Sequence, residues 1–285
     1  MASDDRSVSA GKVPSSDDGT NTPVRIGIAL VSAFVLGAGG LLFGAVLLGV
    51  TVLLLSAGFG WSASSASTLV LSLIFVQGVG CAGVALAYVR SRSLIASTVS
   101  SLLGTVPRRE FSIGARLPSL SDLGIAVAGY VLAILGAIIG NIIVSTFVDA
   151  ETGTNQAAEV GMQNPEVLLL LIPASFLLIG PGEELLFRGI VQGRLREVMS
   201  AVPAILITAA FFAGIHFFAL TGGSLTGNLA ALGVLTLPAL VFGVAYEYTD
   251  NIAVPSLIHG AYNATLFSLL YAAIRFGGNV PSVWV

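Results

Sequence analysis

The sequence predicts an all-α, polytopic transmembrane helix bundle, and three observations support this fold class: composition, hydropathy and the lengths of the apolar stretches. The chain has 285 residues, of which 55% are hydrophobic and only 9% are charged. Its mean hydropathy is +0.95. Soluble domains usually have about 25% charged residues. The deficit of charge therefore indicates a chain that lies largely in lipid.

Seven apolar stretches are long enough to cross a bilayer, which takes about 20 residues of helix. They cover 26–57, 66–89, 122–147, 166–191, 201–220, 227–247 and 252–274. We therefore expect about seven spans, with eight as the alternative, because the first half of the chain is harder to divide. They form one membrane domain over 24–285. The polar, acidic segment 1–23 precedes it, and its composition is typical of a disordered tail.

Three glycine pairs have the GxxxG spacing that lets two helices approach closely. They are Gly40 with Gly44, Gly136 with Gly140, and Gly189 with Gly193. We expect helices to pack tightly at these positions.

The distribution of arginines predicts how the spans are oriented. The connection after the second span and the end of the fourth span contain Arg90, Arg92, Arg108, Arg109, Arg116, Arg194 and Arg196. The connection between the third and fourth spans contains Asp149, Glu151 and Glu159 and no basic residue. Because basic connections stay in the cytoplasm, we expect a multi-pass protein of the cell membrane. Its N-terminus would lie inside and its C-terminus outside.

Two further properties exclude function classes. The net charge of −3 leaves no basic surface for nucleic acid, so no nucleic-acid partner is expected. The lipid bilayer is the expected environment because of the hydropathy. The single cysteine, Cys81, cannot form an internal disulfide and is expected to be a small buried residue.

Three charged residues lie close together in the fourth apolar stretch, within GPGEELLFRG at 180–189. A charge at the centre of a bilayer costs about 2.5–3.5 kcal/mol on the insertion scale. Glu184 and Arg188 are four residues apart, so they share a helix face and are expected to form an ion pair. Glu183 is rotated about 100° from them. It therefore has no obvious local partner and could act in chemistry. The alternative is the inverse assignment, because the long Arg188 side chain can reach either carboxylate.

Both histidines of the chain also lie in apolar stretches. His216 follows a run of apolar residues that includes Phe212, a packing residue expected to wall the site and keep it dry. His259 and Asn263 are four residues apart and share a helix face. Intramembrane ionisable groups are functional by default, so we expect these residues to meet Glu183 in one polar site.

Such a set suits hydrolysis. Glu183 is expected to act as a general base on water, with a neutral His216 holding that water or sharing its proton. His259 and Asn263 would offer N–H donors to a developing oxyanion. Two histidines and a glutamate also suit a three-ligand zinc site, although no H-E-x-x-H motif is present. A non-catalytic membrane scaffold that sequesters a partner is the alternative outside the enzyme class.

The same residues resemble a known family. EELLFR at 183–188 reads E-E-x-x-x-R, Phe212 to His216 reads F-x-x-x-H, and His259 to Asn263 reads H-x-x-x-N. These motifs, in this order, are similar to those of the CPBP intramembrane proteases, which include the type II CAAX prenyl proteases and the bacteriocin-processing and immunity proteins. The resemblance covers about 165–275.

The resemblance implies a helix bundle with a polar cavity open to the cytoplasm and an endopeptidase acting on a membrane-associated peptide or protein. It implies Glu183 as the base, His216 as its partner, and His259 with Asn263 as the oxyanion site. Glu184 and Arg188 would be structural supports. No cofactor is expected under this mechanism, and zinc belongs to the metalloendopeptidase alternative.

Overall fold

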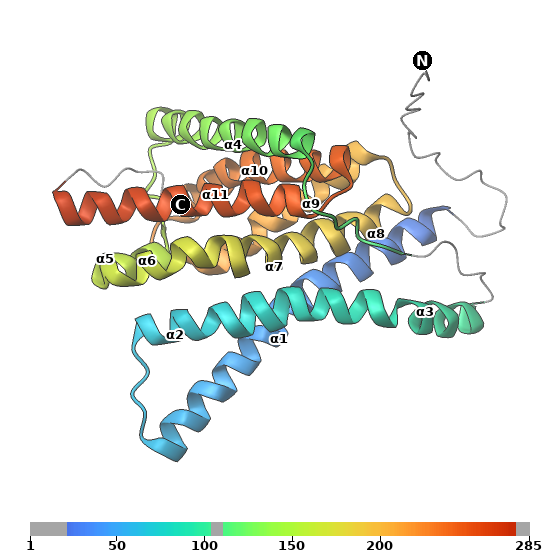
Figure 1. Ribbon diagram of the computed structural model, residues 1–285, viewed down its shortest axis with the longest axis horizontal. Coiled ribbons are helices and arrows are strands. Elements are labelled where there is room, and N and C mark those ends of the chain that lie inside the picture. Colours follow the sequence, from blue (N-terminus) through green and yellow to red (C-terminus); the bar gives the residue numbers. More distant parts are fainter. Residues whose placement is uncertain (1–21, 104–110, 278–285) are drawn as a thin grey trace.

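The computed structural model describes residues 22–103 and 111–277, and these form a bundle of membrane-length helices (Figure 1). Within them, seven helical segments are long and apolar enough to span a bilayer. They run over Pro23–Phe59, Ser65–Leu94, Leu120–Phe147, Pro165–Arg196, Ala201–Ala219, Leu225–Thr249 and Ala253–Phe276. The seven expected spans are thus confirmed, and the described chain has no eighth of this kind. Residues 1–21 of the expected tail, like Arg108 and Arg109, lie outside the described residues.

Two of the spans consist of several helical pieces joined end to end. The second comprises α2 (Ser65–Ser72), the π-helical segment η1 (Leu73–Gly83) and α3 (Val84–Leu103). The fourth comprises α6 (Pro165–Ala174), η2 (Ser175–Ile179), α7 (Gly180–Glu184), η3 (Leu185–Gln192) and α8 (Gly193–Arg196). Pro173 and Pro181 lie in this span, and proline cannot donate the regular helical hydrogen bond. Wider π-turns are frequent at functional sites, and here they flank the Glu183–Glu184 pair.

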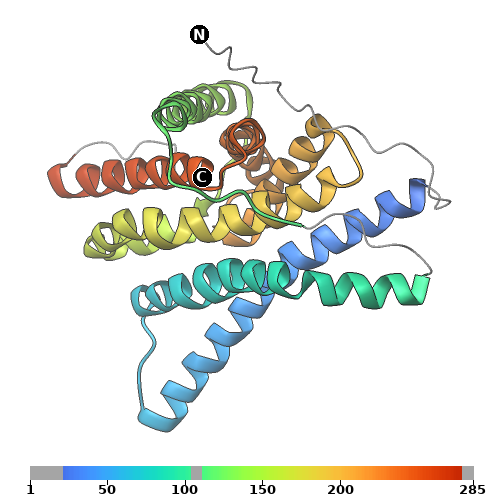
Figure 2. The same ribbon diagram turned by 45° about the vertical axis from the view of Figure 1, so that its right-hand side comes forward.

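The other spans are α1 (Thr22–Phe59), α4 (Leu120–Phe147), α9 (Ala201–Ile215) with the 3₁₀ turn η4 (His216–Ala219), α10 (Leu225–Thr249) and α11 (Ala253–Phe276). α11 contacts α4, α10 and the pieces α6 and α7 of the fourth span. α1 packs on η1 and η3, crosses the second span steeply, and its C-terminal half extends away from the bundle (Figures 1 and 2). Large apolar side chains such as Leu53, Val127 and Leu177 are exposed on these helices, as expected for surfaces that face lipid.

The expected close helix packing is found at Gly40 and Gly44 and, against side chains of α10, at Gly136 and Gly140. Gly189 and Gly193 instead face the side chains of Ile113 and Phe111, in the connection before α4. A Cβ atom at Gly44 would lie 2.4 Å from the Phe75 carbonyl oxygen, and one at Gly40 would lie 2.7 Å from the Gly80 carbonyl oxygen. The backbones of α1 and η1 therefore touch, which leaves no room for a side chain between them.

A short two-stranded antiparallel sheet joins two connections between spans, outside the bundle. β1 (Thr154–Asn155) pairs antiparallel with β2 (Leu220–Thr221), and α5 (Gln156–Gln163) follows β1 directly. The Thr221 hydroxyl also donates to Glu159 Oε2 at 2.6 Å. This strand pair holds the connection before the fourth span against the connection after the fifth span.

The charges separate the bundle into two ends. We call the end at which α3 finishes, and at which the segments 111–119, 196–201 and 249–253 lie, the Arg-rich end. The end formed by 147–165 and 219–225 is the acidic end. α8 and the end of α3 lie at the former, and α5 and the end of α11 at the latter (Figures 1 and 2). Ion pairs tie the Arg-rich connections together: Arg92–Glu197 at 2.7 Å, Arg196–Glu247 at 2.8 Å and Arg116–Asp122 at 3.1 Å.

Candidate active site

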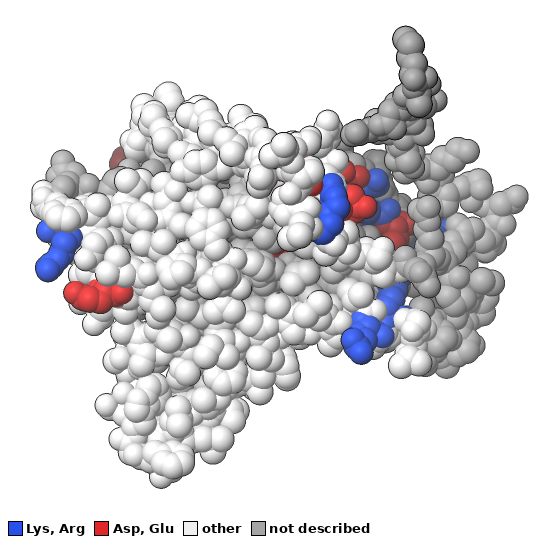
Figure 3. All heavy atoms as spheres, viewed as in Figure 1, with Lys and Arg blue, Asp and Glu red and all other residues white. Residues whose placement is uncertain are grey.

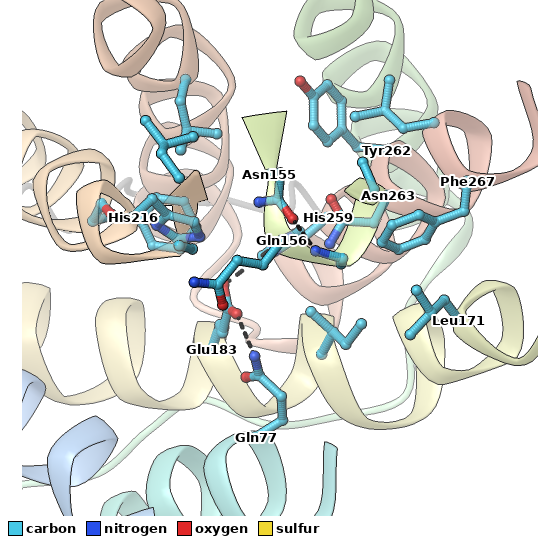
Figure 4. A pocket seen from close by; sticks show the side chains of 18 of the residues that line it. Gln77, Asn155, Gln156, Leu171, Glu183, His216, His259, Tyr262, Asn263 and Phe267 are labelled. Carbon is cyan, nitrogen blue, oxygen red and sulfur yellow. Dashed lines mark hydrogen bonds and ion pairs between the residues drawn. The ribbon is translucent and has the colours of Figure 1, made fainter. Parts of the chain in front are cut away.

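A cavity of about 240 Å³ inside the bundle is lined by all four residues expected to be catalytic: Glu183, His216, His259 and Asn263. They come from three spans, through α7, the start of η4 and α11. In the view of Figure 4, His216 and His259 lie on opposite sides of Glu183. The expected convergence of these residues is therefore found, and their chemical roles can be argued from the contacts.

Glu183 lies at the buried floor of the cavity, with 6% of its surface exposed. Its Oε1 accepts a hydrogen bond from Gln77 Nε2 at 2.8 Å (Figure 4). Its Oε2 has no hydrogen-bond partner among the described residues and lies 3.8 Å from His259 Nε2. One oxygen is thus held in place, while the other remains available as an acceptor.

Gln77 is the functional residue that the sequence analysis missed. It lies in η1 of the second span, far in sequence from the three motifs. A Cβ at Gly182 would lie 2.5 Å from the Gln77 carbonyl oxygen, so the backbones of η1 and α7 are in close contact. The only signal in the sequence was a single amide side chain within an apolar stretch.

Glu184 contacts both other members of a buried polar cluster, Arg188 and His259. Its Oε2 lies 3.1 Å from Arg188 Nε, and both side chains are at most 1% exposed. The expected ion pair is confirmed. Its Oε1 accepts from His259 Nδ1 at 2.8 Å. Glu184 therefore does more than hold Arg188, because it also orients a histidine of the cavity.

Two aromatic rings enclose this cluster. The Arg188 guanidinium carbon lies 4.8 Å from the Phe212 ring centroid and 5.4 Å from that of Phe242. Phe242 also stacks on His259, with centroids 4.9 Å apart. Phe212, only 1% exposed, contacts the rings of both histidines. The expectation that Phe212 walls the site is met, and the rings exclude water from the ion pair, which strengthens it.

The hydrogen bonds of the two histidines define which ring nitrogen faces the cavity. A carboxylate or carbonyl oxygen only accepts, so Nδ1 of His259 donates to Glu184 and Nδ1 of His216 donates to the Phe212 carbonyl oxygen at 2.7 Å. In the neutral rings, both Nε2 atoms therefore have lone pairs.

This tautomer changes the role expected for His259. Its Nε2 can donate a hydrogen bond to an oxyanion only when the ring is protonated, because its one N–H is used by Glu184. Asn263, half-buried and one turn further along α11, also lines the cavity and offers an amide N–H₂ that needs no protonation. The oxyanion site expected from both residues thus depends first on Asn263.

The cavity opens at the acidic end. Its outer lining includes the exposed Gln156 and the half-buried Asn155, His216 and Leu220, whereas the floor at Glu183 is buried. The arginines predict that the Arg-rich end is cytoplasmic, and the resemblance implies a cavity open to the cytoplasm. These two expectations contradict each other. The opening of the cavity, which we call its mouth, lies at the opposite end of the bundle from the arginines.

The zinc alternative requires His216, His259 and Glu183 to converge on one point. Across 22–103 and 111–277, no group of three or more His, Cys, Asp or Glu side chains is arranged to hold a metal ion.

Comparison with known proteins identifies the segment that contains the site. Residues 165–265 match the family described as type II CAAX prenyl endopeptidase Rce1-like. We call residues 165–265 the Rce1-like segment, because they are similar to this family. This confirms the resemblance seen in the three motifs, all of which lie within the matched residues, and it implies a peptidase embedded in the membrane. Gln77 lies outside the Rce1-like segment, on a span that the match does not cover. No curated protein and no solved structure matches the chain.

Proposed function

We propose that the chain is an intramembrane endopeptidase of the CAAX prenyl protease type, which hydrolyses a peptide bond with a water activated by Glu183. The observation that supports this most directly is the unpartnered, buried Glu183 Oε2 at the floor of the cavity. A buried carboxylate oxygen without a protein donor is a strong acceptor for a water molecule. Its other oxygen is fixed by Gln77, so it is also oriented.

The reaction follows from these contacts. As the water oxygen bonds to the peptide carbonyl carbon, one water proton passes to Glu183 Oε2. The lone pair on His216 Nε2 accepts a hydrogen bond from the second O–H of the water. The Asn263 amide donates to the carbonyl oxygen as negative charge develops on it. When the C–N bond breaks, the leaving nitrogen takes the proton from Glu183, which restores the carboxylate.

The apolar part of the lining indicates the kind of substrate. Leu171, Leu232, Leu266 and Phe267 lie along the cavity, which suits a membrane-associated peptide with an apolar segment beside the scissile bond.

The test is Glu183→Gln. Glutamine keeps the shape of the side chain but cannot take a proton, so peptide cleavage should fall by about 10²–10⁴-fold. Glu166→Gln removes the same charge from an exposed position in the first turn of α6 and should leave cleavage unchanged. Comparison of membrane proteomes with each variant would reveal the peptide that accumulates uncleaved. Undiminished cleavage by purified Glu183→Gln protein would refute the mechanism. If no phenotype changed with this variant or with His216→Ala, the scaffold alternative would be favoured.

A zinc-dependent peptidase is the second candidate, and one observation favours it. Both histidines have Nδ1 bound to an acceptor, the arrangement common in metal-binding histidines. Activity that persists after stringent metal removal would eliminate this candidate. Loss of activity that zinc alone restores would favour it over the proposal above.

A further inference from the structure

We infer that the cavity takes its peptide from the non-cytoplasmic side of the membrane. The inference rests on the proposed function only in treating the cavity as the peptide-binding site. The orientation itself follows from where the basic residues, the mouth and the closed floor lie.

The first step is the charge asymmetry between the two ends. In the described part of the chain, six arginines lie at or near the Arg-rich end: Arg25, Arg90, Arg92, Arg116, Arg194 and Arg196. At the acidic end, the described residues include one arginine, Arg275. Figure 3 shows charged side chains gathered at the ends, with an uncharged middle. Basic residues near span ends set orientation, and acidic residues contribute little, so the Arg-rich end is cytoplasmic.

The second step is the position of the mouth. Asn155 and Leu220, which pair in the β1–β2 sheet, both line the cavity. Gln156 follows at the start of α5, is exposed, and donates to the Phe218 carbonyl oxygen at 3.4 Å. Figure 4 shows Asn155 and Gln156 beside the space in front of Glu183. The β1–β2 sheet therefore forms one side of the mouth, at the end of the bundle opposite to the Arg-rich end.

The third step is that the path from the other end is closed. Between Glu184 and the Arg-rich connection, eight residues of the fourth span are buried: Leu186, Phe187, Arg188, Gly189, Ile190, Val191, Gln192 and Leu195. Arg188 and Gln192 donate to the carbonyl oxygens of Ala239 and Gly243, at 2.9 and 3.2 Å. These bonds tie η3 to α10 directly beneath the floor. A peptide from the cytoplasm would have to separate them.

The chemistry of the lining indicates the substrate. The rim is polar and neutral at Asn155 and Gln156, the walls are apolar, and the reacting groups lie at the buried floor. This sequence of polar rim, apolar walls and buried reacting groups suits a peptide at the outer face of the membrane. The apolar end of such a peptide would enter between the walls. The substrate class is therefore a secreted or surface-anchored polypeptide.

Cysteine accessibility tests the orientation. In a Cys81→Ala background, which removes the buried native thiol, Gln156→Cys places a thiol at the mouth. The matched Ser200→Cys places one at an exposed position of the Arg-rich end. Intact cells are treated with a membrane-impermeant maleimide, before and after permeabilisation. We expect Gln156→Cys to react in intact cells and Ser200→Cys to react only after permeabilisation.

The reverse pattern would overturn the inference, and so would equal labelling of both positions in intact cells. A Gln156→Cys thiol that fails to react even after permeabilisation would overturn the assignment of the mouth. Labelling does not require catalysis, so the same result is expected with Glu183→Gln added. An inactive protein that labels from outside would refute the proposed function and leave the orientation standing.

Discussion

Gln77 provides the sharpest test of the proposed mechanism, because it hydrogen-bonds to the carboxylate of Glu183, the proposed base, from outside the Rce1-like segment. Gln77→Met keeps the length and apolar stem of the side chain but removes the donor of the 2.8 Å bond to Glu183 Oε1. Hydrogen bonds to charged groups contribute about 1.5–3 kcal/mol. Since about 1.4 kcal/mol corresponds to a factor of ten, we expect kcat to fall by roughly 10- to 150-fold.

The assay is steady-state cleavage of a peptide substrate by purified protein in lipid. Gln77 bonds the base, so the loss should appear in kcat, with KM little changed. Ser72→Ala is the matched control. Ser72 also lines the cavity from the second span, but its hydroxyl donates to the Leu69 carbonyl oxygen of its own helix. A Gln77→Met enzyme with the kcat of the Ser72→Ala control would refute the view that Gln77 positions the base.

Two further predictions concern stability. Arg188→Met should lower the free energy of unfolding by about 3–5 kcal/mol, because it leaves the Glu184 carboxylate buried without its cation. Denaturant titration of the protein in mixed micelles measures this, and an unchanged midpoint would contradict the pairing. Gly44→Ala should cost about 1–3 kcal/mol, since its Cβ would lie 2.4 Å from a backbone oxygen of η1. Gly49→Ala on the same helix is the control, because its Cβ would meet nothing within 4 Å, and it should be neutral or stabilising. Equal effects of the two changes would show that the loss of stability is not caused by packing against η1.

The local features of the fold followed from the sequence. Span length and hydropathy are properties of continuous segments, so all seven spans were found within a few residues of their observed bounds. The Glu184–Arg188 ion pair was equally local, because a spacing of four residues fixes two side chains on one face of a helix.

What the sequence did not predict depends on contacts between spans and on side-chain rotation. Gln77 meets Glu183 because Gly182 lets η1 and α7 touch, and helical spacing contains no information about that approach. The spacing of His259 and Asn263 placed them on one face, but it could not show that the His259 N–H turns to Glu184. The end at which the cavity opens depends likewise on the pairing of β1 with β2, two strands that lie far apart in the chain.

Glu183 and Glu184 have different partners at the floor of the cavity, and this difference supports Glu183 as the base of the proposed reaction. Each charge at the bilayer centre costs about 2.5–3.5 kcal/mol, and the buried cluster offsets this cost unevenly. Glu184 has a cation and an imidazole as partners, and Arg188 lies between two aromatic rings. The hydrogen-bond partner of Glu183 is the neutral amide of Gln77. In the proposed reaction, the proton from water therefore goes to the carboxylate that has no cation beside it, while the Glu184–Arg188 pair continues to hold the surrounding helices together.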